Sequence, residues 1–161
     1  MLALPARFWN SQTLKRLEIG SRRPSGGGGG IGLDYAKMKV LVIENEMPTA
    51  MMMVSLLTEI GCDAQVATKG KRGMEIAQKQ KFDLILLDTH LPDISGFEIC
   101  RELKQRHISY RTPIVFLSNQ RGDEYRERAL ELGAADFIEK PFEARGFISR
   151  ISSQLEETAT P

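Results

Sequence analysis

Polar and charged residues stand directly after several short apolar runs of this 161-residue chain, where they could act together as one site. They supply carboxylates, an amide, a hydroxyl and an ammonium group: Glu44, Asn45, Glu46, Asp88, Ser118 and Lys140. Crowded carboxylates repel one another unless a hard divalent cation neutralises them, and Mg²⁺ prefers one or two carboxylates together with water and phosphate oxygens. The residue types therefore indicate magnesium and phosphoryl chemistry.

Asp88 is the candidate nucleophile of this set. A carboxylate held beside a metal can attack a phosphoryl group and form an acyl phosphate. Lys140 could then pair with one phosphoryl oxygen as a compact point charge, and Ser118 could donate a hydrogen bond to another. A lone Asp after a strand is usually a helix cap or a turn residue, so this interpretation requires the other groups to lie close to Asp88.

Three runs of four apolar residues predict buried strands at residues 40–43, 84–87 and 114–117. Such runs, with β-branched residues and no alternation, are typical of strands that are covered on both faces. Weaker strands are expected at residues 63–67 and 136–138.

Segments of helix length separate these strands and carry apolar residues at three- and four-residue spacing. Gly61 and Gly133 follow two of the segments, where left-handed C-terminal caps are expected. Strand and helix alternate five times, which predicts an α/β fold with a five-stranded, doubly wound parallel sheet. Ligands of such sheets bind beyond the carboxyl ends of the strands, where the polar set stands.

The composition is that of an ordinary globular protein, with 42% hydrophobic and 27% charged residues and a net charge of +1. Residues 38–161 carry 16 Lys and Arg against 19 Asp and Glu, which argues against electrostatic nucleic-acid binding by the folded part. No apolar run approaches the roughly 20 residues of a membrane-spanning helix, so no membrane association is expected. Cys62 and Cys100 lack His or Cys neighbours at metal-ligand spacing and are expected to be reduced thiols of a cytoplasmic protein.

Residues 1–37 are expected to form a disordered, basic, glycine-rich leader, with six Lys and Arg against two Asp and Glu. The low-complexity run at residues 25–30 cannot bury enough apolar surface to order itself. The preferred interpretation is an extension upstream of a natural start at Met38; an organelle transit peptide, or a basic arm that touches a nucleic acid or a membrane, is an alternative. The domain is expected over residues 38–156, followed by a C-terminal tail at residues 157–161.

Four stretches of the chain resemble the receiver domain of response regulators in two-component signalling. They occur in order and at the expected spacing, and with the segments between them they cover residues 38–156: residues 39–46, 82–96, 113–118 and 133–142. The resemblance implies the flavodoxin-like (βα)5 receiver fold. It also implies a phosphorylation-dependent signalling switch that accepts a phosphoryl group on Asp88 from a histidine kinase or a histidine phosphotransfer protein.

The resemblance implies a role for each residue that matches the family's motifs. Ser118 stands at the position of the switch hydroxyl, Lys140 at that of the phosphoryl-binding lysine, and Phe137 at that of the aromatic residue that rotates inward on activation. The implied ligands of Mg²⁺ are Glu44, Asn45, Asp88 and the backbone carbonyl of His90.

Two residues depart from the family's pattern. Asn45 replaces a carboxylate that normally contacts the metal, and a neutral amide oxygen binds Mg²⁺ more weakly. Asn119 is larger than the residue that usually follows the switch hydroxyl and could narrow the access to Asp88. Asn45 leaves an alternative open, namely a pseudo-receiver that acts as a binding module and no longer needs phosphorylation.

The resemblance further implies that the protein is not an enzyme beyond its own phosphotransfer and slow autodephosphorylation. Its signal is expected to pass by protein–protein contact to a target on the face of the fourth helix, fifth strand and fifth helix, and a phosphorylation-dependent homodimer is also expected. No DNA-binding domain is expected in the chain. An aspartate-based phosphatase would need a second acid where His90 stands, and a nucleotide- or flavin-binding enzyme would need a glycine-rich loop after the first strand.

Overall fold

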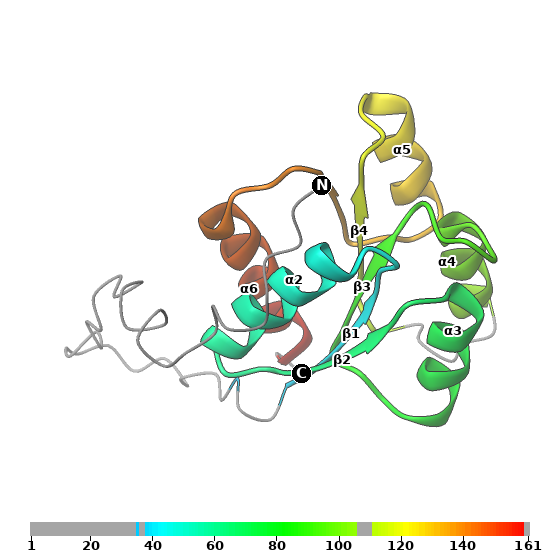
Figure 1. Cartoon of the computed structure of the whole chain (residues 1–161). Helices are drawn as coiled ribbons and strands as arrows, with labels where there is room; N and C mark the ends of the chain where they lie inside the picture. Colours follow the sequence, from blue (N-terminus) through cyan, green and yellow to red (C-terminus); the bar gives the residue numbers. More distant parts are fainter. Residues whose placement is uncertain (1–34, 36–37, 106–110, 160–161) are drawn as a thin grey trace, which may run out of the picture. The chain divides into compact units, whose positions relative to one another are not determined.

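Strands and helices alternate along the described residues of the computed structural model, which are 35, 38–105 and 111–159. The strands are β1 (Lys39–Ile43), β2 (Asp63–Ala67), β3 (Leu84–Asp88), β4 (Ile114–Ser118) and β5 (Asp136–Glu139). The helices are α2 (Met47–Glu59), α3 (Gly70–Lys79), α4 (Gly96–Gln105), α5 (Asp123–Glu131) and α6 (Ala144–Ala159) (Figure 1). None of the helices in these ranges is long and apolar enough to cross a membrane.

All five strands join one parallel sheet in the order β2-β1-β3-β4-β5, which confirms the predicted fold class. The chain runs from β1 outward to β2 and then crosses to β3 on the other side of β1, so the strand order reverses between β1 and β3. Loops after two such strands diverge and leave room for a ligand. Because Ile43 pairs with Leu87, the register brings the next residues, Glu44 and Asp88, to neighbouring positions at this point.

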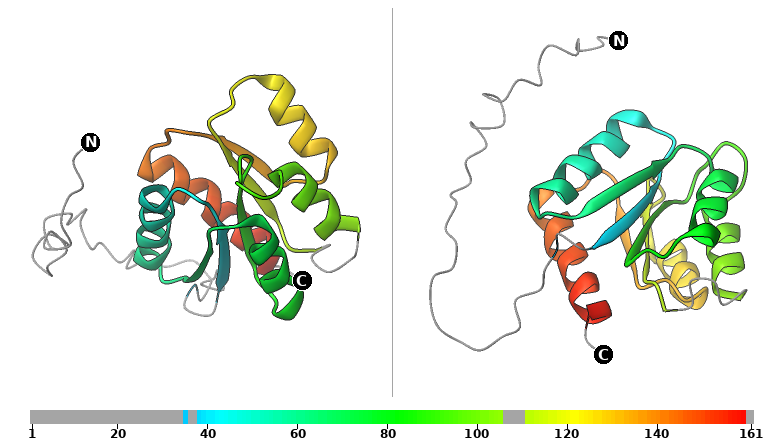
Figure 2. Two further views of the ribbon diagram at one scale, coloured as in Figure 1. Left: turned by 45° about the vertical axis from the view of Figure 1, so that its right-hand side comes forward. Right: turned by 90° about the horizontal axis from the view of Figure 1, so that it is seen from below.

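Helices cover both faces of the sheet, as Figure 1 shows for α2 and α6 on one side and α3 and α4 on the other, and Figure 2 shows the same layers from two further directions. Alternate residues of each strand supply the two cores. Leu41 and Ile43 of β1 pack on the side of α3, α4 and α5, whereas Val40 and Val42 pack on the side of α2 and α6. Burial on both faces explains why the central strands are continuous apolar runs.

Glycine ends two of the helices, as the sequence predicts. Gly61 follows α2 with a φ of 95° and donates its N–H to the Thr58 carbonyl at 3.0 Å. Gly133 follows α5 with a φ of 87° and donates to the Leu130 carbonyl at 2.9 Å. These are left-handed caps that satisfy carbonyl groups at the ends of the helices.

The described residues belong to one compact unit, Leu33–Pro161. Tyr35 lies upstream of Met38, packs against the core on the side of α2 and α6, and donates its hydroxyl to Glu156 Oε1 of α6 at 3.0 Å. At the other end α6 continues to Ala159. Apart from Tyr35, the predicted leader at residues 1–37 lies outside the described residues, so the domain boundaries at 38 and 156 stay predictions.

Candidate functional site

Four of the polar residues that the sequence singles out are buried at the carboxyl edge of the sheet. Glu44 and Ser118 have no exposed surface, and Asp88 and Lys140 are 4% and 6% exposed. They stand at or just beyond the ends of β1, β4, β3 and β5, respectively. Charged groups are almost never buried without a partner, so their surroundings need a full account.

The Lys140 ammonium group connects the two buried carboxylates. Its Nζ lies 2.5 Å from Glu44 Oε2 and 3.4 Å from Asp88 Oδ1. The other oxygen of Glu44, Oε1, accepts a hydrogen bond from the Glu46 N–H at 2.9 Å. Two carboxylates therefore share one ammonium, and the cluster carries an excess of negative charge when all three groups are ionised.

This excess of charge affects the acidity of Asp88. Burial raises the pKa of the Asp88 carboxyl, and the charge of Glu44 raises it further. The charge of Lys140 and a hydrogen bond from the His90 N–H to Asp88 Oδ1, 3.3 Å long, lower the pKa but do not outweigh the first two effects. A cation placed beside Asp88 would favour its ionised form.

Asn45 faces both Asp88 and the loop after β3. With its amide nitrogen turned inward, Asn45 donates to the His90 carbonyl at 2.9 Å and to Asp88 Oδ2 at 3.2 Å. With its amide oxygen turned inward, three oxygens face one another at these distances, and a cation is then needed between them. Asn45 can therefore either satisfy the two oxygens itself or join them as a ligand.

These three oxygens fit Mg²⁺. An octahedral shell with Mg–O distances of 2.0–2.1 Å places neighbouring ligands about 2.9 Å apart, close to the distances around Asn45. Within the described ranges no cluster of three His, Cys, Asp or Glu side chains could hold a metal ion. The oxygens that fit here belong to one carboxylate, one amide and one backbone carbonyl. The two oxygens of Glu44, a predicted ligand, are hydrogen-bonded to Lys140 and Glu46, and its role as a ligand stays a prediction.

The Ser118 hydroxyl is held by two groups. Ser118 Oγ lies 2.7 Å from Thr89 Oγ1, and the Gln120 N–H donates to Ser118 Oγ at 3.0 Å. Sequence reasoning did not find Thr89. Its position in the strand register could have identified it. Asp88 pairs with Leu117, so the next residues, Thr89 and Ser118, are neighbours.

The loop between β3 and α4 is held at two points by hydrogen bonds. Asp93 accepts hydrogen bonds from the Gly70 and Lys71 N–H groups at the start of α3, at 2.8 and 2.9 Å. Gly96 donates its N–H to the Thr89 carbonyl at 3.1 Å, and any side chain at Gly96 would collide with the Asp88 carbonyl oxygen. These contacts, which the sequence did not reveal, hold the loop that carries the His90 carbonyl.

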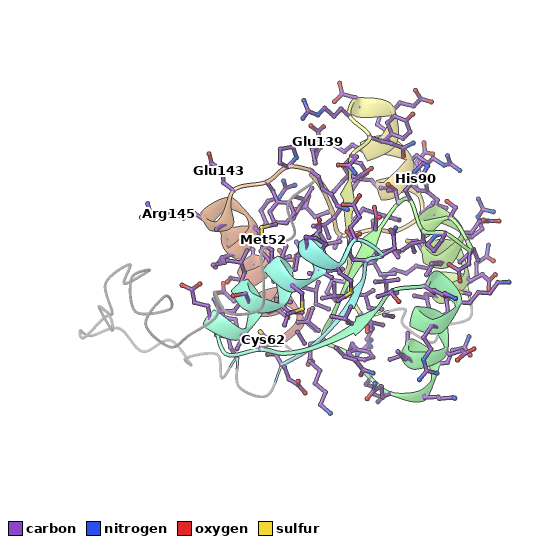
Figure 3. The ribbon with its side chains drawn as sticks, in the orientation of Figure 1. Met52, Cys62, His90, Glu139, Glu143 and Arg145 are labelled. Atoms are coloured by element: carbon purple, nitrogen blue, oxygen red, sulfur yellow. The ribbon has the colours of Figure 1, made fainter. Side chains whose placement is uncertain are left out.

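An open pocket leads from the surface to Asp88. Its lining residues come from the loops after β1, β3 and β4: Asn45, Glu46, Asp88, Thr89, His90, Asn119 and Gln120. Figure 3 shows His90 on the loop beyond β3, and its side chain is exposed. Asn119 lies at the mouth, where the sequence predicts that it narrows the access.

Phe137 is fully buried in β5. Its ring centroid lies 6.4 Å from that of Phe116, and the Arg126 guanidinium carbon lies 5.7 Å from the ring centroid. Arg150 of α6 binds the Phe137 carbonyl at 3.0 Å and the Asp136 carboxylate. The aromatic side chain at the predicted switch position thus occupies an inward position, in the core on the side of α3, α4 and α5.

Comparisons with known proteins agree with this fold. The family model of the response regulator receiver domain matches residues 40–152. The transcriptional regulatory protein CusR of Escherichia coli is 36% identical over 122 residues, which cover 76% of this chain and 53% of CusR. The response regulator ArlR of Staphylococcus saprophyticus is 35% identical over 117 residues, which cover 73% of this chain and 52% of ArlR.

Solved structures show the same likeness. The BeF3-activated N-terminal receiver domain of RstA from Klebsiella pneumoniae is 29% identical, with a TM-score of 0.68, and the match covers 73% of this chain and 97% of that domain. The chain belongs to the response regulator receiver domain family, as the sequence motifs predicted. It spans about half the length of the curated relatives that it matches.

Proposed function

We propose that this receiver domain is a phosphorylation-dependent switch in which Asp88 accepts a phosphoryl group from a histidine kinase or a histidine phosphotransfer protein. The observation that carries the proposal is the different surroundings of the two Asp88 oxygens. Oδ2 faces Asn45, whereas Oδ1 faces the Lys140 ammonium at 3.4 Å and the His90 N–H at 3.3 Å. In this proposal one oxygen of the Asp88 carboxylate binds the metal ion and the other attacks the phosphoryl group.

Mg²⁺ would be held by Asp88 Oδ2, the Asn45 amide oxygen and the His90 carbonyl, and it supplies charge neutralisation for the phosphoryl oxygens. Asp88 Oδ1 is then the oxygen free to attack. A bond forms between Oδ1 and phosphorus, the bond from phosphorus to the donor's histidine nitrogen breaks, and its electron pair stays on the imidazole. The charge of Glu44 completes the negative surroundings of the metal.

Lys140 and Ser118 act on the phosphoryl group. The Lys140 ammonium lies within reach of Oδ1. A phosphoryl group bound to Oδ1 would therefore pair with the positive charge of Lys140, which Glu44 and Asp88 now share. Ser118 supplies a hydroxyl to a second phosphoryl oxygen. We propose no other reaction for the domain beyond slow loss of its own phosphate.

The signal would leave through the face formed by α5, β5 and α6. These are the fourth helix, the fifth strand and the fifth helix predicted from the sequence. Phe137, Arg126 and Arg150 connect these three elements, so a displaced Ser118 or Phe137 would alter them together. We propose that a downstream target protein, or a second copy in a phosphorylation-dependent homodimer, binds this face. Cys62 and Cys100 are buried free thiols, in keeping with the reducing cytoplasm that we propose as the location.

A second candidate function is a pseudo-receiver that binds partners without phosphorylation. One observation favours it: the Asn45 amide nitrogen can satisfy Asp88 Oδ2 and the His90 carbonyl with no metal present. The two functions differ in whether Mg²⁺ and a phosphoryl group change the domain.

Beryllofluoride, a non-covalent mimic of an aspartyl phosphate, tests the proposal. Amide NMR spectra of the ¹⁵N-labelled protein are recorded with Mg²⁺ alone and with Mg²⁺ and beryllofluoride. A switch predicts large shifts at Thr89, Ser118 and Lys140 that need both components and that are lost on adding a chelator.

Two matched variants complete the experiment. Asp88→Asn should abolish the response, whereas Asp63→Asn, which removes an exposed carboxylate at the start of β2, should keep it. A wild-type protein whose spectrum does not respond would support the pseudo-receiver and contradict the switch.

A further inference from the structure

Thr89 and Ser118 form a buried pair of hydroxyl groups beside the proposed phosphoryl site. Their oxygens lie 2.7 Å apart, and the two residues are 4% and 0% exposed. The Thr89 N–H also donates to the Leu117 carbonyl at 3.2 Å, which continues the pairing of β3 with β4 by one residue. The pair is therefore a fixed part of the sheet edge.

Most of the hydrogen-bonding capacity of the Ser118 hydroxyl is already used. A serine hydroxyl has one proton to donate and two lone pairs. The Gln120 N–H uses one lone pair, and Thr89 makes the other contact, either as donor or as acceptor. In the described part of the chain no hydrogen bond joins Ser118 Oγ to Asp88.

The register explains why Ser118 contacts Thr89 and not Asp88. Successive residues of a strand point to opposite faces. Since Asp88 pairs with Leu117, Thr89 and Ser118 point to one face and Asp88 to the other. Ser118 must rotate about χ1 to reach a phosphoryl group on Asp88, and staggered rotamers lie about 120° apart, so the rotation breaks the contact with Thr89.

We propose that Thr89 is a positioning residue that holds Ser118 in the resting orientation and so opposes switching until Asp88 is phosphorylated. The inference rests on the proposed function and concerns the regulation of the same site. Thr89 acts through Ser118 and does not touch the phosphoryl group. The strength of one buried hydrogen bond then helps to set how much of the protein adopts the phosphorylated arrangement.

The test compares Thr89→Val, which keeps the shape and removes the hydroxyl, with Thr89→Ser, which keeps the hydroxyl. Beryllofluoride is titrated into each protein in saturating Mg²⁺. Thr89→Val should bind beryllofluoride about five-fold more tightly than the wild type, because a hydrogen bond that stabilises only the resting state is lost. Thr89→Ser should bind like the wild type.

A second measurement separates this role from a structural one. Thr89→Val should also lower the free energy of unfolding of the resting protein, and a double-mutant cycle with Ser118→Ala should show that the two hydroxyls are coupled. Lower stability together with tighter binding identifies the resting-state contact. A merely structural role would weaken both.

Four outcomes overturn the inference. Weaker binding by Thr89→Val would mean that Thr89 assists Ser118, and unchanged binding or an absent coupling would mean that the contact plays no part in switching. A wild-type protein that does not respond to beryllofluoride would defeat the proposed function and this inference with it. If the wild type responds normally to beryllofluoride but Thr89→Val does not bind it more tightly, only this inference fails and the proposed function stands.

Discussion

The Asn45 side chain lies 3.2 Å from the Asp88 carboxylate oxygen Oδ2, at the reversal of strand order between β1 and β3. The same amide group lies 2.9 Å from the His90 carbonyl. Asn45 can donate to both oxygens in the metal-free protein or turn its own oxygen toward them when a cation is bound. The orientation of one neutral amide therefore separates a metal-dependent switch from a domain that needs no metal.

A charge at position 45 should strengthen metal binding. We expect Asn45→Asp to lower the Kd for Mg²⁺ at least about ten-fold, because a second carboxylate joins the ligands. Isothermal titration calorimetry with MgCl2 measures the change. Asn119→Asp, which adds the same charge at the mouth of the pocket, is the matched control. Equal affinities for Asn45→Asp and the wild type would exclude Asn45 from the metal site.

Loss of the Lys140 ammonium should destabilise the fold. Lys140→Met leaves Glu44 and Asp88 buried without their counter-charge, and we expect the free energy of unfolding to fall by about 3–5 kcal/mol. Urea denaturation measures it. Lys79→Met, at the exposed end of α3, should cost less than about 0.5 kcal/mol. A second change, Asp88→Asn, should restore part of the loss, and a Lys140→Met protein as stable as the wild type would contradict the charge assignment.

The stability of the domain should depend on pH through Asp88. Because its pKa is raised in the folded protein, the folded state binds a proton more readily than the unfolded chain does. The free energy of unfolding should therefore fall as the pH rises from the ordinary carboxyl range, about 4, through the raised pKa. Asp88→Asn should remove this fall.

At neutral pH we expect Asp88→Asn to be more stable than the wild type, since it removes a buried charge that Glu44 repels. The difference should vanish in acid, where Asp88 is protonated. Denaturation curves at several pH values, without Mg²⁺, test this. Parallel pH profiles for the two proteins would show that the burial of Asp88 has no effect on its acidity.

Gly96 should tolerate no side chain. A Cβ atom there would collide with the Asp88 carbonyl oxygen and lie 3.0 Å from Thr89 Cα, both parts of the backbone. We expect Gly96→Ala to cost about 2 kcal/mol or more and to weaken beryllofluoride binding, because the loop of His90 must move. Gly146→Ala in α6 meets nothing within 4 Å and should instead stabilise the protein by about 0.5–1 kcal/mol. Similar effects of both changes would count against the close contact.

The sequence predicted the frame of the site well. Short apolar runs without alternation are typical of strands buried on both faces, and the strand ends then place Asp88, Ser118 and Lys140 at one edge. The contacts that position these groups were not predicted. Thr89 and Asp93 are ordinary residues after a strand, and their partners follow from register and from where α3 begins, which periodicity does not give to within one residue.

The orientation of Glu44 was also beyond the sequence. Glu44 is an acid directly before Asn45, which suggests a metal ligand. In the structure Glu44 pairs with Lys140, 96 positions away along the chain. Such a pair depends on the packing of β5 beside β4, which brings Lys140 over the edge of the sheet. Residue type predicted the chemistry here, and tertiary structure decided the partner.

Covalent phosphorylation of Asp88 is the central claim, and intact-mass spectrometry after incubation with Mg²⁺ and acetyl phosphate tests it most directly. The wild type should gain the mass of one phosphoryl group, and Asp88→Asn or a chelator should prevent the gain. No added mass in the wild type, with acetyl phosphate or with a histidine kinase as donor, would contradict the account. So would an equal gain by Asp88→Asn.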